Sequence, residues 1–226
     1  MITILHGALG SAHQFEKLRS VLGVPSTVIS FHGHGGTVDT NEPWSIDLFS
    51  KQLETELENA SSQGPALIFG YSMGGYVALD CALRRPGLIG RIVTLGTKLE
   101  WTMEGAEHET TKLNPEVIEA KVPAFAQDLA LRHGTDTWKT VLQKTADLMR
   151  SLGASPVLTH ERVGSLNTPV LYGIGDRDEM VTLAETVDFY KATPGAELTV
   201  LPGTRHPIER VNPVLLSHHL LSFLAP

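Results

Sequence analysis

Short runs of apolar residues alternate along this chain with segments in which apolar residues recur at helical spacing. The apolar runs are rich in Val, Ile and Leu and do not alternate with polar residues, which is typical of strands buried on both faces of a sheet. We expect strands at residues 2–5, 26–31, 66–69, 91–95, 170–174 and 198–201.

The segments between these runs have the periodicity of amphipathic helices. In residues 46–60, for example, Ile46, Phe49, Leu53 and Leu57 fall on one helical face. Strands separated by helices pair in parallel through right-handed crossovers. The sequence therefore predicts an α/β fold with a doubly wound, mostly parallel sheet, and a ligand site at the carboxyl ends of its strands. The helices are expected at residues 12–22, 46–60, 75–84, 183–191 and 214–224.

One long segment interrupts this alternation. Residues 97–164 contain helical patterns but no convincing strand. We expect residues 1–96 and 165–226 to form the α/β core and residues 97–164 to form a helical cap insertion. A substrate pocket is expected beneath the cap, although large apolar residues in such an insertion more often form its own core. The candidate pocket residues are Leu9, Trp101, Met103, Phe125 and Trp138.

A glycine-rich pentapeptide joins the third predicted strand to the helix that follows it. Gly70-Tyr71-Ser72-Met73-Gly74 has the Gly-x-Ser-x-Gly pattern in the strand–turn–helix context which that pattern requires. A tight turn strains the backbone at the serine, and the flanking glycines remove Cβ atoms that would clash there. We therefore expect Ser72 to be a catalytic nucleophile.

A serine hydroxyl becomes nucleophilic when a base takes its proton, and a carboxylate must orient that base. Position selects His206 among the ten histidines, because it follows the last predicted strand at the carboxyl edge of the sheet. Asp176 and Asp178 follow the preceding strand at the same edge. On position alone, both aspartates are candidates for the catalytic acid.

The turn after the first strand supplies a candidate group for binding negative charge on a reacting carbonyl oxygen. Gly7 allows the backbone to turn so that a nearby N–H faces the nucleophile. The expected oxyanion-hole donors are the backbone N–H groups of Ala8 and Met73, with Leu9 a weaker alternative to Ala8. One such donor typically contributes about 3 kcal/mol of transition-state stabilisation.

Together, these residues resemble the α/β-hydrolase family, in particular its small esterase-like members with a helical cap. Gly175-Asp176-Arg177-Asp178 resembles the family's strand followed by Gly-x-x-Asp, which implies that Asp178 is the catalytic acid. The order serine, aspartate, histidine along the chain is also that of the family. Two positions depart from the family pattern: Ser30 stands where an aspartate is usual, and Arg205 replaces the second glycine of Gly-x-Gly-His.

The resemblance implies hydrolysis of a carboxylic ester or thioester of a small to medium acyl substrate, through an acyl-enzyme on Ser72. One alternative is a C–C bond hydrolase or lyase similar to the menaquinone-pathway synthase, which has an arginine where this chain has Tyr76. The other is a non-catalytic small-molecule receptor on the same scaffold. The complete set of serine, histidine and aspartate argues against the receptor.

Composition narrows the possible partners and compartments. The chain has a net charge of −7 and no basic stripe, which argues against a nucleic-acid partner. No apolar run is long enough to span a membrane, and the N-terminus lacks a signal-peptide pattern, so we expect a cytoplasmic protein. The single cysteine, Cys81, allows no intramolecular disulfide. A small-molecule acyl substrate is the expected partner, and the sequence gives no indication of oligomeric state.

No metal or organic cofactor is expected. His6, His32 and His34 come closest to a metal-binding pattern, but they lie on two different loops. They also have no acidic companion at the spacing of metal ligands.

Overall fold

The computed structural model describes residues 1–39, 42–60 and 64–224, which form one parallel sheet with helices on both faces. The strand order is β2-β1-β3-β4-β5-β6, and every neighbouring pair is parallel. This arrangement confirms the predicted doubly wound sheet. The strands are β1 (Ile2–Leu5), β2 (Ser26–Ile29), β3 (Ala66–Tyr71), β4 (Ile89–Leu95), β5 (Val170–Gly175) and β6 (Glu197–Leu201).

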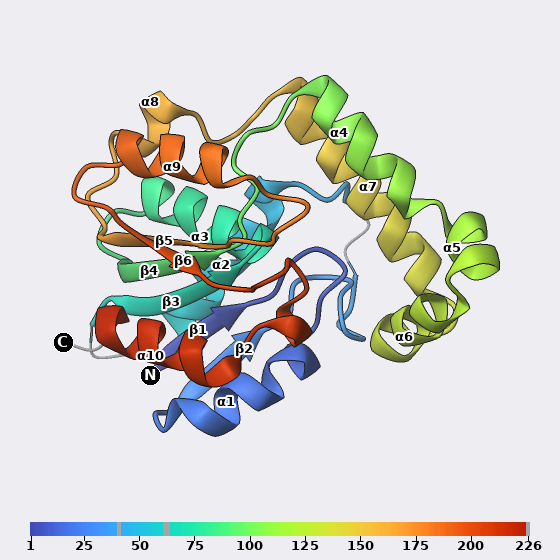
Figure 1. Cartoon of the computed structure of the whole chain (residues 1–226), viewed down its shortest axis with the longest axis horizontal. Helices are drawn as coiled ribbons and strands as arrows, with labels where there is room; N and C mark the ends of the chain where they lie inside the picture. Colours follow the sequence, from blue (N-terminus) through green and yellow to red (C-terminus); the bar gives the residue numbers. More distant parts are fainter. Residues whose placement is uncertain (40–41, 61–63, 225–226) are drawn as a thin grey trace.

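Helices cover the two faces of the sheet, and each face buries its own apolar cluster (Figure 1). In β3, Ile68 belongs to one cluster and its neighbour Phe69 to the other. Successive strand residues point to opposite faces, so a strand covered on both sides is apolar throughout. On one face lie α1 (Glu16–Leu22) and α10 (Pro213–Leu224), and on the other lie α2 (Ile46–Asn59), α3 (Met73–Arg84) and α9 (Leu183–Ala192).

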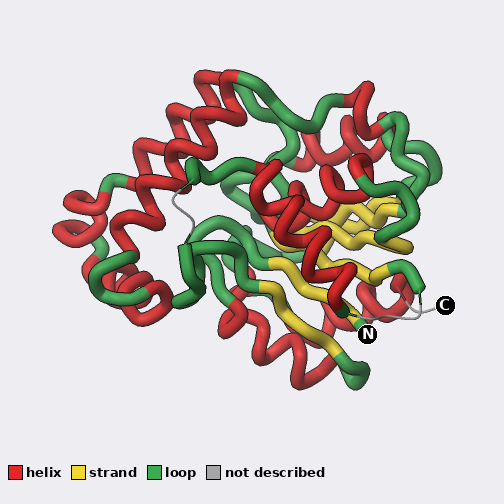
Figure 2. Tube along the Cα trace, turned by 180° about the vertical axis from the view of Figure 1, so that it is seen from behind, coloured by secondary structure: helices red, strands yellow, loops and turns green. Residues whose placement is uncertain are grey.

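Between β4 and β5 the chain is helical. The helices are α4 (Met103–Thr110), α5 (Pro115–Lys121), α6 (Pro123–His133), α7 (Trp138–Ala154) and α8 (His160–Val163). α4 packs along α7, and α6 packs against α5 and α7, so these four helices form one group beside the carboxyl ends of the strands (Figure 1, Figure 2). We call them the α4–α7 group. The short α8 packs instead against α3 and α9. The division of the chain into a core and a cap at residues 97–164 stays a prediction.

The helix predicted at residues 12–22 is in fact two elements. A 3₁₀ turn, η1 (Ala12–Phe15), precedes α1, and Gly23 follows α1 with a left-handed φ of 64°. Two further 3₁₀ turns are η2 (Thr111–Leu113) and η3 (Ile208–Arg210). None of the helices in the described part of the chain has the length and apolar character needed to cross a membrane.

Candidate active site

Four loops bring the predicted catalytic residues to one edge of the sheet. Ala8 follows β1, Ser72 lies between β3 and α3, Asp178 follows β5 and His206 follows β6. β2 lies on one side of β1, whereas β3 to β6 lie on the other, so the strand order reverses between β1 and β3. Ser72 and Ala8 therefore lie at the switch point, which is where sheets of this kind bind ligands.

Ser72 occupies a strained turn between strand and helix. Its φ is 52° and its ψ is −120°, a conformation that residues other than glycine rarely adopt. A Cβ on Gly70 would lie 2.5 Å from the Cα of Gly75, and a Cβ on Gly74 would lie 2.5 Å from the carbonyl oxygen of Leu5. The close packing of the turn therefore requires the two glycines of the motif. The N-terminus of α3, which begins directly after the serine, favours negative charge at this point.

His206 and Asp178 form a hydrogen-bonded pair. Nδ1 of His206 lies 2.8 Å from Oδ2 of Asp178, and the two side chains are 16% and 3% exposed. The other carboxylate oxygen, Oδ1, accepts hydrogen bonds from the backbone N–H groups of Met180 (2.9 Å) and Val181 (2.8 Å). These bonds fix the carboxylate. The carboxylate in turn holds the proton of His206 on Nδ1. The other ring nitrogen, Nε2, can therefore accept a proton.

Asp176, the alternative acid, makes different contacts. Its Oδ1 accepts a hydrogen bond of 3.2 Å from the backbone N–H of Thr204, which ties the loop after β5 to the loop after β6. Its Oδ2 lies 3.9 Å from Nε of the exposed Arg177. The geometry thus favours Asp178 as the partner of His206 and gives Asp176 a structural role.

Two residues that sequence reasoning missed support the pair of Asp178 and His206. The hydroxyl of Tyr71 donates a hydrogen bond of 2.8 Å to the backbone carbonyl of His206. Burial raises the pKa of this phenol far above its usual value, so it remains a donor. Gly96 has a φ of 58°, and a Cβ there would lie 3.1 Å from Oδ2 of Asp178 and 3.3 Å from Nδ1 of His206. No local sequence signal marks either contact, because the partners are distant along the chain.

The residues predicted to bind an oxyanion lie together. Ala8, Ser72 and Met73 line the same cavity. Gly7 permits this approach, since a Cβ there would lie 2.9 Å from Cβ of Ser72. The backbone N–H groups of Ala8 and Met73 make no hydrogen bond to another residue in the described chain. Both groups are therefore available to a developing oxyanion.

Leu9 connects the same loop to the α4–α7 group. Its φ is 57°, and its carbonyl oxygen accepts hydrogen bonds from Nη1 of Arg132 (2.7 Å) and Nε2 of His133 (3.0 Å), both on α6. Nδ1 of His133 accepts a hydrogen bond of 3.1 Å from the backbone N–H of Gly35, so the proton of this ring lies on Nε2. Burial lowers the pKa of His133 to about 4, which keeps the ring neutral.

An apolar cavity opens beside Ser72, between the core and the α4–α7 group. Met73 and Tyr76 of α3 line one side, and Leu148, Met149 and Leu152 of α7 line another. An acyl chain on Ser72 would therefore contact mainly hydrocarbon.

The sequence profile of the alpha/beta hydrolase family matches residues 4–218. The chain belongs to the alpha/beta hydrolase family.

Some relatives carry esterase and lipase names at low identity, and others are named as carbamate hydrolases or as a synthase. The chain is 22% identical to the sn-1-specific diacylglycerol lipase ABHD11 of Mus musculus, over 99% of this chain and 80% of that protein. It is 23% identical to the pimeloyl-[acyl-carrier protein] methyl ester esterase of Vibrio vulnificus, over 87% of this chain and 82% of that protein. Among solved structures, NosK from Streptomyces actuosus shares the fold with a TM-score of 0.80 and 24% identity, over 98% of this chain and 96% of that chain.

The cavity of this α/β-hydrolase includes one of the five predicted pocket residues. Trp101 lines the cavity, whereas the other four candidates do not. Met103 is 74% exposed and lies at the surface, whereas Phe125 is 37% exposed and lies at the edge of the packed helices. Trp138 is buried in a separate cluster within the α4–α7 group, and Leu9 packs against that cluster. Helical periodicity identifies an apolar face but does not tell whether that face meets the cavity, a neighbouring helix or solvent.

Three of the four ring nitrogens of the buried His6 and His34 contact the backbone, and Nε2 of His34 has no hydrogen-bond partner among the described residues. Nδ1 of His6 lies 2.8 Å from the carbonyl oxygen of Gly7, and its Nε2 accepts a hydrogen bond from the N–H of Phe31 at 3.1 Å. Nδ1 of His34 lies 3.0 Å from the carbonyl oxygen of His32. Burial lowers the pKa of His6 to about 4 and that of His34 well below its usual value. Among the described residues, no group of three or more His, Cys, Asp or Glu side chains could hold a metal ion.

Proposed function

We propose that this α/β-hydrolase cleaves a carboxylic ester or thioester of a small to medium acyl substrate, with Ser72, His206 and Asp178 as its catalytic triad. The observation that carries the proposal is the 2.8 Å contact between His206 and the buried carboxylate of Asp178, at the same sheet edge as the strained turn of Ser72. A histidine oriented by a fixed carboxylate is the group that a serine nucleophile needs as its base.

The reaction would proceed in two halves. Oγ of Ser72 attacks the acyl carbonyl carbon while Nε2 of His206 takes the hydroxyl proton. The backbone N–H groups of Ala8 and Met73 bind the negative oxygen of the tetrahedral intermediate. His206 then gives its proton to the leaving alcohol or thiol, which departs and leaves an acyl-enzyme. Water attacks the acyl-enzyme in the same way, with His206 again as base, and releases the carboxylic acid and the free serine.

Family membership and the esterase and lipase names of its relatives support ester chemistry. The synthase alternative has less support. Tyr76 stands where the synthase has its arginine, and the tyrosine hydroxyl accepts a hydrogen bond of 2.8 Å from the backbone N–H of Leu158. A receptor without catalysis would have no need of the oriented pair of Asp178 and His206.

Turnover of p-nitrophenyl esters from acetate to decanoate tests the proposal. We expect the shorter esters to be hydrolysed, and we expect Ser72→Ala to lower kcat/KM by at least about 10³-fold. Ser151→Ala makes the same substitution at an exposed position on α7 and should behave as the unmodified protein does. If the folded protein turns over none of these esters, or if Ser72→Ala retains the activity, ester hydrolysis by Ser72 is wrong.

A further inference from the structure

Lys98 introduces a charged group into the wall of the apolar cavity beside Ser72. It lies between β4 and α4, and its side chain is 15% exposed. The other described residues that line the cavity are apolar or uncharged. A largely buried ammonium group is costly unless it is well paired with a partner.

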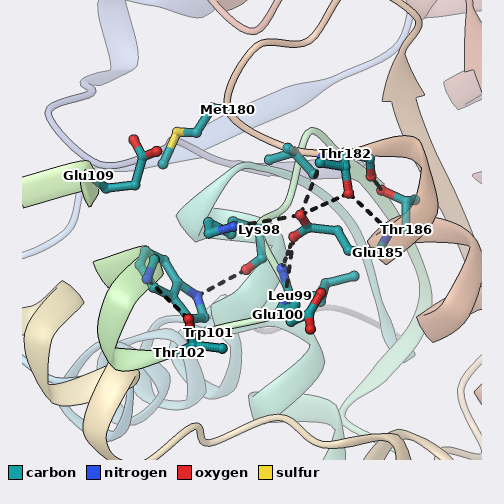
Figure 3. Close-up of polar contacts among 12 residues, drawn as sticks. Lys98, Leu99, Glu100, Trp101, Thr102, Glu109, Met180, Thr182, Glu185 and Thr186 are labelled. Carbon is teal, nitrogen blue, oxygen red and sulfur yellow. Dashed lines mark hydrogen bonds and ion pairs between the residues drawn. The ribbon is translucent and has the colours of Figure 1, made fainter. Parts of the chain in front are cut away.

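The ammonium group of Lys98 is only loosely paired within the protein (Figure 3). Its Nζ lies 3.6 Å from Oε2 of Glu185 and 5.6 Å from the centre of the Trp101 ring. The distance to Glu185 is longer than that of a hydrogen bond. An ammonium has three N–H donors, and in the described chain none of them makes a hydrogen bond to another residue.

Glu185 does not depend on Lys98 for its own hydrogen bonds. Its Oε1 accepts hydrogen bonds from the backbone N–H groups of Leu99 (3.1 Å) and Glu100 (3.4 Å). Its Oε2 accepts two more, from the backbone N–H and the hydroxyl of Thr182, both at 3.2 Å. Glu185 also lies in the first turn of α9, where the helix N-terminus favours a negative charge. The carboxylate is thus stabilised by its own donors, and the ammonium remains available to a ligand.

The other two carboxylates labelled in Figure 3, those of Glu100 and Glu109, do not pair with Lys98. Glu100 is exposed to solvent, where its charge is screened. Both oxygens of Glu109 lie close to Nζ of Lys112, at 2.9 and 3.0 Å. Trp101 is held in place beside the lysine, because its Nε1–H donates a hydrogen bond of 3.1 Å to the carbonyl of Lys98.

We propose that Lys98 binds an ionised carboxylate on the substrate, so that the preferred substrates are monoesters or monothioesters of dicarboxylic acids. The scissile carbonyl would lie at Ser72, the methylene chain against the apolar walls, and the distal carboxylate at Nζ of Lys98. Each part of such a substrate meets a surface of matching chemistry. This inference rests on the proposed function of Ser72.

The test compares monomethyl adipate with methyl hexanoate, which has the same chain length but no carboxylate. We expect the ratio of kcat/KM for the two esters to favour the half-ester in the unmodified protein. Lys98→Met removes the charge and keeps a long side chain, and it should lower this ratio by about 10-fold or more, mainly through KM of the half-ester. Lys98→Arg should restore part of the preference. Lys121→Met makes the same substitution at an exposed position on α5 and should leave the ratio unchanged.

The outcomes separate this inference from the proposed function. If methyl hexanoate is hydrolysed in a Ser72-dependent way but Lys98→Met has the same ratio as the unmodified protein, the role of Lys98 is wrong and the function stands. If the unmodified protein prefers methyl hexanoate, the inference also fails. If neither ester is hydrolysed and Ser72 does not react, both proposals fail. Circular dichroism of each variant shows whether the fold is intact.

Discussion

The two carboxylate oxygens of Asp178 have different partners: Oδ1 contacts the backbone and Oδ2 contacts the side chain of His206. Oδ1 accepts hydrogen bonds from two backbone N–H groups, and Oδ2 lies 2.8 Å from Nδ1 of His206. Asp176 lies two positions earlier and uses its carboxylate on the backbone of Thr204 instead. Asp178 therefore orients the His206 ring, whereas Asp176 orients the backbone of Thr204. Substitution of each aspartate can distinguish these two effects.

The first prediction compares Asp178→Asn with Asp176→Asn. An amide at position 178 would present a neutral group to His206. The histidine would then lose both its correct tautomer and the stabilisation of its imidazolium form. We expect kcat on p-nitrophenyl butyrate to fall by roughly 10³- to 10⁴-fold in Asp178→Asn. Asp176→Asn should lower it less than about 10-fold, because its carbonyl oxygen can still accept from Thr204. Steady-state kinetics of both variants check this, and the reverse ranking would contradict the choice of Asp178.

The second prediction concerns Gly96, whose missing Cβ leaves room for the acid–base pair. In Gly96→Ala the new methyl would press on Asp178 and His206, in addition to the strain of an alanine at φ 58°. Gly87 is a matched control, because its φ is 88° and nothing lies within 4 Å of a Cβ there. Both variants should lose about 1 kcal/mol of stability from backbone strain. Only Gly96→Ala should lose at least about 10-fold in kcat, since a misplaced catalytic group is costly. Equal activities would show that the contact is unimportant.

The third prediction is a loss of stability in acid. His6 and His133 are neutral in the folded protein because burial lowers the pKa of each to about 4. In the unfolded chain they regain a pKa near 6.5, so the unfolded state binds more protons between these values. The free energy of unfolding that comes from keeping these two histidines neutral is complete above pH 6.5 and is lost as the pH falls towards 4. For the fully buried His6, the loss between pH 7.5 and 4.5 is about 2 to 3 kcal/mol.

Urea unfolding at pH 7.5 and pH 4.5 measures this loss of stability. His133→Gln removes one of the titrating rings, so the free energy of unfolding should depend less steeply on pH than in the unmodified protein. His108→Gln changes an exposed histidine and should keep the original dependence. An unchanged dependence in His133→Gln would show that His133 is not held neutral by the fold.

Much of the fold could be predicted because its signals are local. Most strands contain a short apolar run, and each core helix has a stripe of apolar residues, so the pattern of the chain alone indicates their order. The split of residues 12–22 into η1 and α1 was missed, since a 3₁₀ turn has no distinct apolar period. The turn that contains Ser72 was predictable for the same local reason, because its strand, turn and helix are consecutive.

The parts of the site that were missed depend on contacts between distant segments. The carbonyl of Leu9 meets Arg132 across 123 positions, and Tyr71 meets the carbonyl of His206 across 135 positions. The sequence did not show that Met103 and Phe125 lie outside the cavity lining, because a helix pattern does not specify how the helix is rotated against the core. The sequence did not indicate that Lys98 lines the cavity, because a lysine between a strand and a helix is usually exposed to solvent.

The central claim is that Ser72 is an activated nucleophile, and covalent labelling tests it most directly. A fluorophosphonate probe reacts with a serine whose proton is taken by a neighbouring base. We predict that the unmodified protein gains the mass of one probe, that peptide mapping places it on Ser72, and that Ser72→Ala gains none. A folded, unmodified protein that does not react, or that carries the probe on another residue, would contradict the account.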